Sequence, residues 1–169
     1  MHHKLVYYGN KTLHQVADEI KNINQEIIDL VETMYKIMYK ENGVGLAGPQ
    51  IDECKKIITI DIKHLNGPRI TLINPEIIAK SNEVDPYEEG CLSLPGISAA
   101  VIRPSKITVK AFTPDEKQIL IDADGLFARV LQHEIDHLNG IVFVDHLEDH
   151  IKKSLRSELK NIKKLNKES

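Results

Sequence analysis

The sequence predicts an α+β fold in which a mostly antiparallel sheet surrounds a central helix, with N-terminal and C-terminal helices beside it. Three segments carry apolar residues at three- and four-residue steps, which is the helical period. The middle of the chain is instead rich in β-branched residues between turn signals. The 169 residues, 41% of them hydrophobic and 28% charged, suffice for one domain, 1–169, with one core.

The first predicted helix runs from about Asn24 to Asn42. Asn24 is a suitable N-cap, and Asn42 followed by Gly43 is a suitable stop. The segment from Gly43 to Gln50 contains three glycines and a proline, so we expect it to form a loop. The apolar stripe of this helix consists of Ile27, Leu30, Val31, Met34, Ile37 and Met38.

Strands are expected next. Pro75 falls inside the second of them and indicates an edge strand or a bend. A hairpin-like turn, Thr113 to Glu116, separates the last two. The expected strands cover residues 56–63, 69–78, 101–112 and 118–123.

Two more helices follow the strands. One runs from about Leu126 to Asn139 and ends before Gly140, a residue type common just past a helix end. The other runs from about Leu147 to the end of the chain. We expect the first of these to be the central helix, with the sheet wrapped around it.

Composition and charge exclude several classes of protein. A formal net charge of −3 gives no global sign of a nucleic-acid binder, so no DNA partner is expected. The sequence contains no run of about 18 apolar residues, so no membrane span is expected. The N-terminus also lacks the apolar stretch of a signal peptide. We therefore expect a cytoplasmic protein whose two cysteines, Cys54 and Cys91, are thiols.

The expected central helix carries the run His133-Glu134-Ile135-Asp136-His137. Residues four apart lie on one face of a helix, so the two imidazoles can bind one metal ion. Glu134 lies beside them, where it can reach a water at the metal without being a ligand. The run therefore predicts a hydrolase with a divalent metal, while a hydrogen-bonded pair of buried histidines is the alternative.

A metal site of this kind needs a third protein ligand. A third histidine six residues after the second is excluded, because that position is Phe143. The upstream candidate is Cys91, in a segment that also has two carboxylates, two glycines and a proline. Downstream candidates in charged stretches of the chain are His146, His150 and Glu158.

Three segments resemble, in order and spacing, the three signature motifs of peptide deformylases. Gly43 to Gln50 reads Gly-Val-Gly-Leu-Ala-Gly-Pro-Gln, where the family usually has Gly-x-Gly-x-Ala-Ala-x-Gln. Gly48 is therefore a departure, and we expect it to loosen the loop slightly. The other two motifs, Glu-Gly-Cys-Leu-Ser and Gln-His-Glu-x-Asp-His-Leu, are complete at residues 89–93 and 132–138.

The resemblance implies a bacterial-type peptide deformylase. Such an enzyme removes the formyl group from the N-terminal methionine of newly made polypeptides and releases formate. The implied metal ligands are Cys91, His133 and His137, with a fourth position open for water. Glu134 would be the general base. The Gln50 side-chain amide and the Leu92 backbone N–H would stabilise the negative oxygen that forms from the formyl carbonyl.

The resemblance also suggests a metal and a place for the substrate. Family members commonly use Fe²⁺ and accept Zn²⁺, Ni²⁺ or Co²⁺, in keeping with a thiolate ligand. The backbone at Gly45 would pair with the extended peptide. Val44 and Val130 either line the methionine pocket or belong to the core. Gln50 has an alternative role as an amide that braces its own loop.

The C-terminal segment is basic. Bacterial-type family members dock on the ribosome through a C-terminal helix, and cationic side chains suit the phosphates of ribosomal RNA. The alternative is a solvated helix face. The last twenty residues contain only two acidic residues, Glu158 and Glu168. Their lysines and arginine are Lys152, Lys153, Arg156, Lys160, Lys163, Lys164 and Lys167.

Two other classes of function remain open at this point. A metalloprotease that cuts inside peptides shares the helix motif but has no need of Cys91. A binding module with a structural metal needs four protein ligands and gives Glu134 no role.

Overall fold

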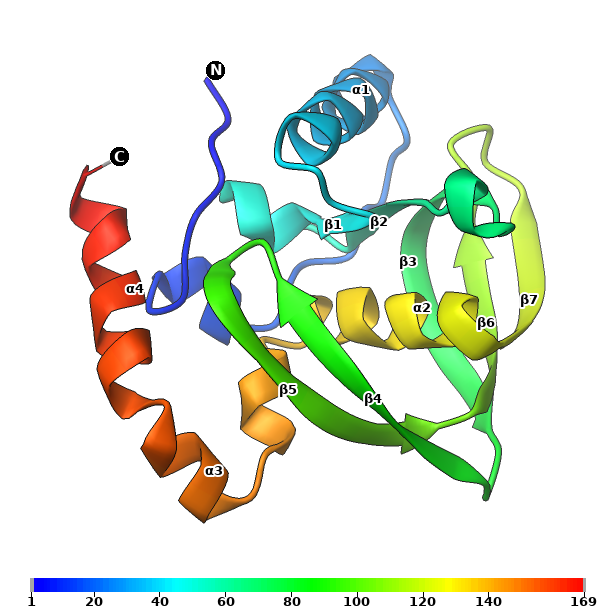
Figure 1. The fold of residues 1–169 in the computed structure, drawn as a ribbon. Coiled ribbons are helices and arrows are strands. Elements are labelled where there is room, and N and C mark those ends of the chain that lie inside the picture. Colours follow the sequence, from blue (N-terminus) through cyan, green and yellow to red (C-terminus); the bar gives the residue numbers. More distant parts are fainter. Residues whose placement is uncertain (1, 169) are drawn as a thin grey trace.

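The computed structural model describes residues 2–168 and shows two sheets with a helix between them (Figure 1). The strands are β1 Gly45–Ala47, β2 Ile57–Asp61, β3 Arg69–Lys80, β4 Val84–Cys91, β5 Leu94–Pro104, β6 Lys106–Phe112 and β7 Gln118–Asp124. The helices are α1 Gln25–Lys40, α2 Gly125–Leu138, α3 Asp149–Ser154 and α4 Arg156–Glu168. Short 3₁₀ turns occupy Lys11–His14, Gly48–Ile51, Lys63–Leu65 and Phe143–His146.

The larger sheet has the strand order β1-β2-β3-β6-β7, and every neighbouring pair is antiparallel. β4 and β5 form a separate antiparallel hairpin. Helix α2 lies between this hairpin and the larger sheet (Figure 1), and it contacts β1, β2, β6 and β7. The predicted α+β class with a central helix is confirmed, but the sheet is divided into two.

Helix α2 is buried on more than one side, which explains its role as the centre of the fold. Ala128, Leu131, Ile135 and Leu138 join the apolar cluster that β2 and β6 also supply. Other positions of the same helix bury polar side chains, which cost free energy unless they find partners. These buried polar residues are Arg129, Gln132, Glu134 and His137.

One strand prediction was wrong, and of the two alternatives given for Pro75 the structure has the bend. The expected strand 101–112 is two strands of different sheets, because the chain leaves the hairpin after Pro104 and enters the larger sheet at Lys106. Strand β3, which contains Pro75, lies inside the sheet and not at its edge. The expected bend is present, since the register with β6 shifts between Ile73 and Glu76.

The segment 43–50 was predicted to be a loop but contains strand β1 and part of a 3₁₀ turn. Gly48 does not loosen it. A Cβ atom there would lie 2.7 Å from the carbonyl oxygens of Glu53 and Lys55, so the backbone of residues 53–55 packs where a side chain would be. The glycine is therefore needed for a close approach of two backbone segments.

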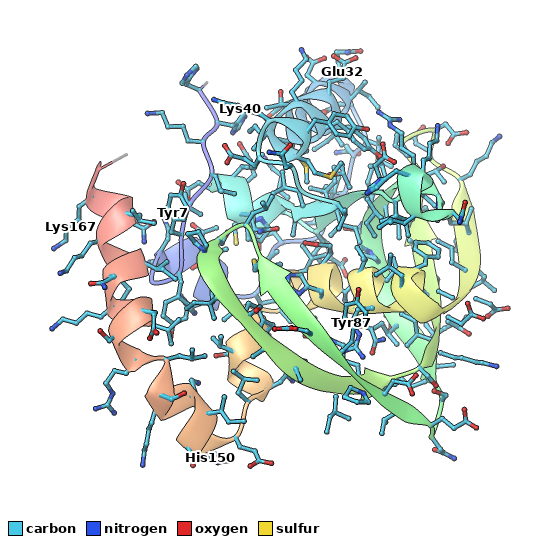
Figure 2. The ribbon with its side chains drawn as sticks, viewed as in Figure 1. Tyr7, Glu32, Lys40, Tyr87, His150 and Lys167 are labelled. Atoms are coloured by element: carbon cyan, nitrogen blue, oxygen red, sulfur yellow. The ribbon has the colours of Figure 1, made fainter. Side chains whose placement is uncertain are left out.

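The C-terminal helical stretch is interrupted, because α3 and α4 meet at Leu155. Leu159 and Ile162 of α4 are buried in a cluster with Val101 and Phe143. Figure 2 shows His150 and Lys167 on the outer side of these helices. Across the described residues, no helix combines the length and apolar character that crossing a bilayer requires.

Candidate active site

The end of β4 and the C-terminal half of α2 bring Cys91, His133 and His137 together. One potential ligand atom from each residue lies within 4.8 Å of the other two. Cys91 Sγ is 3.4 Å from His137 Nε2. Among residues 2–168, this is the one group of three or more such side chains close enough to hold a metal ion. His146, His150 and Glu158 do not belong to it.

The donor set fits a divalent metal. One thiol and two imidazoles are ligands of borderline metals, and three protein ligands leave a position open. Burial lowers the pKa of His137 well below its ordinary value, which keeps this imidazole neutral. Within the described chain, the buried side-chain atoms without a hydrogen-bond partner are Glu134 Oε1 and His137 Nδ1. Both atoms belong to this site, so its polar groups are arranged to contact a partner that is not part of the protein.

Glu134 points toward strand β1. A Cβ atom at Gly45 would lie 2.5 Å from Glu134 Oε2, so the carboxylate occupies the space that any side chain at position 45 would need. Burial raises the pKa of Glu134 to about 7. A carboxyl group with such a pKa can take up and return a proton near neutral pH.

Gln50 has two roles in the structure. Its Oε1 accepts a hydrogen bond from the Ala47 N–H at 2.9 Å, so it does brace its own loop. Its Nε2 lies 3.5 Å from Cys91 Sγ and 3.2 Å from Ser93 Oγ, which directs the donor toward the candidate metal site. Leu92, which follows Cys91, lines a cavity beside the site, and its side chain packs against the apolar cluster that includes Met34 and Met38 of α1.

A buried carboxylate, Glu89, connects the hairpin to α2. Its Oε1 is 2.9 Å from His133 Nδ1, which directs the other ring nitrogen of His133 toward Cys91. Arg103 donates to Glu89 from Nε at 2.6 Å and from Nη2 at 2.9 Å. Arg129 Nη1 donates to Oε2 at 2.8 Å. Glu89 therefore holds a metal-ligand candidate in orientation, as carboxylates commonly do for histidines at metal sites.

The charge of this cluster is settled by its hydrogen bonds. Burial by itself would raise the pKa of Glu89, but hydrogen bonds from His133, Arg103 and Arg129 outweigh burial and hold that pKa far below its usual range. The same contacts raise the pKa of Arg103 despite its burial. Glu89 is therefore ionised at every pH at which the protein is expected to work.

The site opens into a cavity of about 530 Å³. Val44 and Val130 line this cavity, and both also pack against the main apolar cluster, so the two roles weighed for them are compatible. Tyr87 and Leu65 stand at the lining as half-exposed side chains. Figure 2 shows Tyr87 on the hairpin, over α2.

No sequence pattern assigned a role to Arg103 or Arg129, although both donate hydrogen bonds to Glu89. Glu89 was noted only as part of a motif. A weak signal was available for Arg129, since it lies four residues before His133 and therefore on the same helix face. Phe143, which excluded a third histidine, is buried and stacks on His133 with ring centroids 6.2 Å apart.

The fold and the site together define a hydrolase with a candidate Cys-His-His metal centre at a helix covered by a β-hairpin. Comparison with known proteins agrees. A family model described as polypeptide deformylase matches residues 2–153. The peptide deformylase of Brachyspira hyodysenteriae (strain ATCC 49526 / WA1) is 42% identical over 165 residues, which is 95% of this chain and 88% of that protein.

Solved structures show the same similarity. A peptide deformylase from Legionella pneumophila has a TM-score of 0.89 at 36% identity, covering 100% of this chain and 99% of that one. Peptide deformylase 1B from Arabidopsis thaliana, in complex with an inhibitor, has a TM-score of 0.90 at 34% identity, covering 98% and 92%. The chain belongs to the peptide deformylase family, whose members are hydrolases that remove the N-formyl group from polypeptides.

Replacing Glu89 should destabilise the protein strongly. Glu89→Ala removes the anion that the buried Arg103 and Arg129 share and leaves Arg103 paired with Asp136 alone. Breaking a buried ion pair from one side costs about 3–5 kcal/mol. The free energy of unfolding, from urea titration at pH 7, measures the loss. Glu88→Ala, which removes the exposed neighbouring carboxylate, is the matched control and should cost under about 1 kcal/mol.

The pH dependence gives a second check on the same variant. The fold lowers the pKa of Glu89 below the value this group has in the unfolded chain. Its contribution to the free energy of unfolding is therefore complete above the unfolded-state pKa, and it is lost progressively as pH falls from there toward the folded-state pKa. The difference between wild type and Glu89→Ala should therefore narrow in acid. If Glu89→Ala and Glu88→Ala lost the same free energy of unfolding at pH 7, the anchoring role of Glu89 would be contradicted.

Proposed function

We propose that this chain deformylates formyl-methionyl polypeptides with one divalent metal ion held by Cys91, His133 and His137. The observation that carries the proposal is the meeting of these three side chains beside Glu134, whose buried carboxylate has an oxygen without a protein partner. A divalent ion held there supplies Lewis acidity and lowers the pKa of a water molecule. The rest of the reaction falls to the protein's own side chains.

Glu134 accepts a proton from the attacking water. The water oxygen adds to the formyl carbon, and the carbonyl oxygen becomes negative. The Gln50 Nε2 and the Leu92 N–H are proposed to donate hydrogen bonds to that oxygen, a contribution typically worth about 10²–10³ in turnover per donor. The carbon–nitrogen bond then breaks, Glu134 returns its proton to the departing amine, and formate and a free methionine N-terminus remain.

The substrate is proposed to lie along β1. This strand is at the edge of the larger sheet, and Val44 and Gly45 line the cavity. An extended peptide can add to such an edge by backbone hydrogen bonds. The methionine side chain would then enter the cavity between Val44 and Val130. We expect this reaction in the cytoplasm, where new polypeptides emerge.

The other classes of function account for less of the site. A metalloprotease with this helix motif has no use for a thiol beside the histidines. A structural metal site would need a fourth protein ligand and would give no role to a buried carboxylate with a raised pKa. For the metal, Fe²⁺ is proposed in the cell, with Zn²⁺, Ni²⁺ or Co²⁺ able to replace it.

The ribosome is proposed as a partner through α3 and α4. Lys153, Arg156 and Lys160 are exposed, and they line a surface groove with Lys152 and Lys163. Such a surface suits RNA phosphates. Deleting α4 is a poor test because Leu159 and Ile162 are buried, so removing the helix would expose core.

The enzymatic proposal predicts selective chemistry. The reduced, metal-loaded protein should release formate from a formyl-methionyl tripeptide and leave the acetylated peptide intact. Glu134→Gln should lose about 10²–10⁴ in kcat/KM, the usual worth of general acid–base catalysis, while it retains the metal. Cleavage between residues of the peptide would favour the protease, and a fully active, metal-loaded Glu134→Gln would refute the base assignment.

The rate should rise with pH. Glu134 must be ionised to accept a proton, and burial raises its pKa to about 7 in the protein alone. A bound cation lowers this pKa, so kcat/KM should increase in proportion to hydroxide concentration and level off at or below about pH 7. A profile of kcat/KM from pH 5 to 8 tests this, and a decline across that range would argue against a single base.

Ribosome binding should depend on charge. Changing Lys153, Arg156 and Lys160 together to Gln should weaken co-sedimentation with ribosomes and reduce its salt dependence, because fewer counterions are released. The matched control changes the exposed Lys36, Lys40 and Lys117, which carry the same charge away from α3 and α4; Figure 2 labels Lys40 on α1. Identical binding by the two variants would exclude the helical surface as the docking site.

A further inference from the structure

The hydrogen-bonded cluster around Glu89 continues to the protein surface. Arg103 Nη1 donates to Asp136 Oδ2 at 2.7 Å. The same oxygen is 2.8 Å from His146 Nε2. His146 ends the 3₁₀ turn Phe143–His146, and its side chain is 36% exposed. An unbroken series of contacts therefore leads from the half-exposed His146 to His133.

Each contact in this series restricts the next one. Arg103 is 5% exposed and uses Nε, Nη1 and Nη2 in hydrogen bonds, the first and last to Glu89 and the middle one to Asp136. A planar guanidinium held at both ends has one orientation. That orientation sets both oxygens of Glu89, and Glu89 Oε1 in turn sets the ring of His133. Asp136 therefore helps to orient His133, acting through Arg103 and Glu89.

His146 is the second donor to Asp136. The Asp136 side chain is 20% exposed, so without His146 water can compete for the oxygen that Arg103 uses. His146 was a candidate metal ligand from the sequence, but in the structure it contacts Asp136 and does not belong to the candidate ligand group. We propose that His146 is a positioning residue for the metal site, acting through Asp136 and Arg103 on Glu89 and His133.

This inference rests on the proposed metal site, and release of the metal tests it separately from formate release. The protein is loaded with Co²⁺, and transfer of the ion to excess EDTA is followed by the cobalt–thiolate absorption band. Loss of a direct partner of a metal-ligating histidine typically costs 10–100-fold in metal affinity, so a residue three contacts further out should cost less, about threefold. His146→Phe should therefore release Co²⁺ about threefold faster than wild type.

Two variants separate positioning from general damage. His146→Gln keeps a nitrogen donor for Asp136 and should restore slow release. His150→Phe is the matched control, because His150 is an exposed histidine of the adjoining helix that contacts Glu148. It should release Co²⁺ as wild type does. If His146→Phe and His150→Phe release the ion at one rate, the proposal is wrong.

A double-mutant cycle tests the route. If His146 acts through Asp136, adding His146→Phe to Asp136→Asn should cause no further acceleration of release. Additive effects would show that His146 does not act through Asp136 and would overturn the proposal. Asp136→Asn alone should release Co²⁺ faster than wild type, so the series can be tested even if His146→Phe folds poorly. A defect in formate release with normal Co²⁺ retention in wild type would instead count against the proposed function.

Discussion

The carboxylate of Glu89 is the interaction on which the rest of the site depends. It lies on β4, while His133 and Arg129 lie on α2 and Arg103 lies on β5, so its hydrogen bonds join the hairpin to the helix. Burying one carboxylate among two guanidinium groups costs desolvation that only complete hydrogen bonding repays. Here the carboxylate accepts from all three neighbours, which makes the arrangement specific as well as stable.

This anchoring explains how a hairpin outside the main sheet can supply a candidate metal ligand. β4 and β5 pair only with each other in the described structure, and Cys91 lies at the end of β4. Arg129 donates to the carbonyl oxygens of Val101 and Asp85 as well, so it fastens both strands to α2. With the hairpin fixed, Cys91 meets the two histidines, and strand β1 closes the site from the other side.

The sequence predicted the residues of the candidate site better than it predicted the arrangement of the strands. Helical spacing identified His133, Glu134 and His137. Cys91 was a candidate from its unusual neighbours, the resemblance selected it among the alternatives, and the fold places it beside the two histidines. The division of the sheet was missed because β4 contains Pro86, Gly90 and adjacent carboxylates, which are poor strand formers. Its pairing with β5 depends on contacts with α2 that no local pattern encodes.

The partners of charged residues were also beyond the sequence. Arg103 and Arg129 are 26 residues apart and meet on one carboxylate only after the hairpin folds over α2. Gly48 shows the same limitation, since the need for glycine comes from the way residues 53–55 fold back against it, which its own motif does not encode. Periodicity identifies which face of an element is buried, whereas hydrogen-bond partners are decided by tertiary contacts.

The most direct test of the account is the ligand set of the bound metal. X-ray absorption at the metal edge of the Zn²⁺-loaded protein should show one sulfur neighbour at about 2.3 Å and two imidazole nitrogens at about 2.0–2.1 Å. Cys91→Ala should lose the sulfur neighbour, and Cys54→Ala should keep it. A coordination shell without sulfur in the wild-type protein would contradict the role of Cys91 and, with it, the assignment of this site.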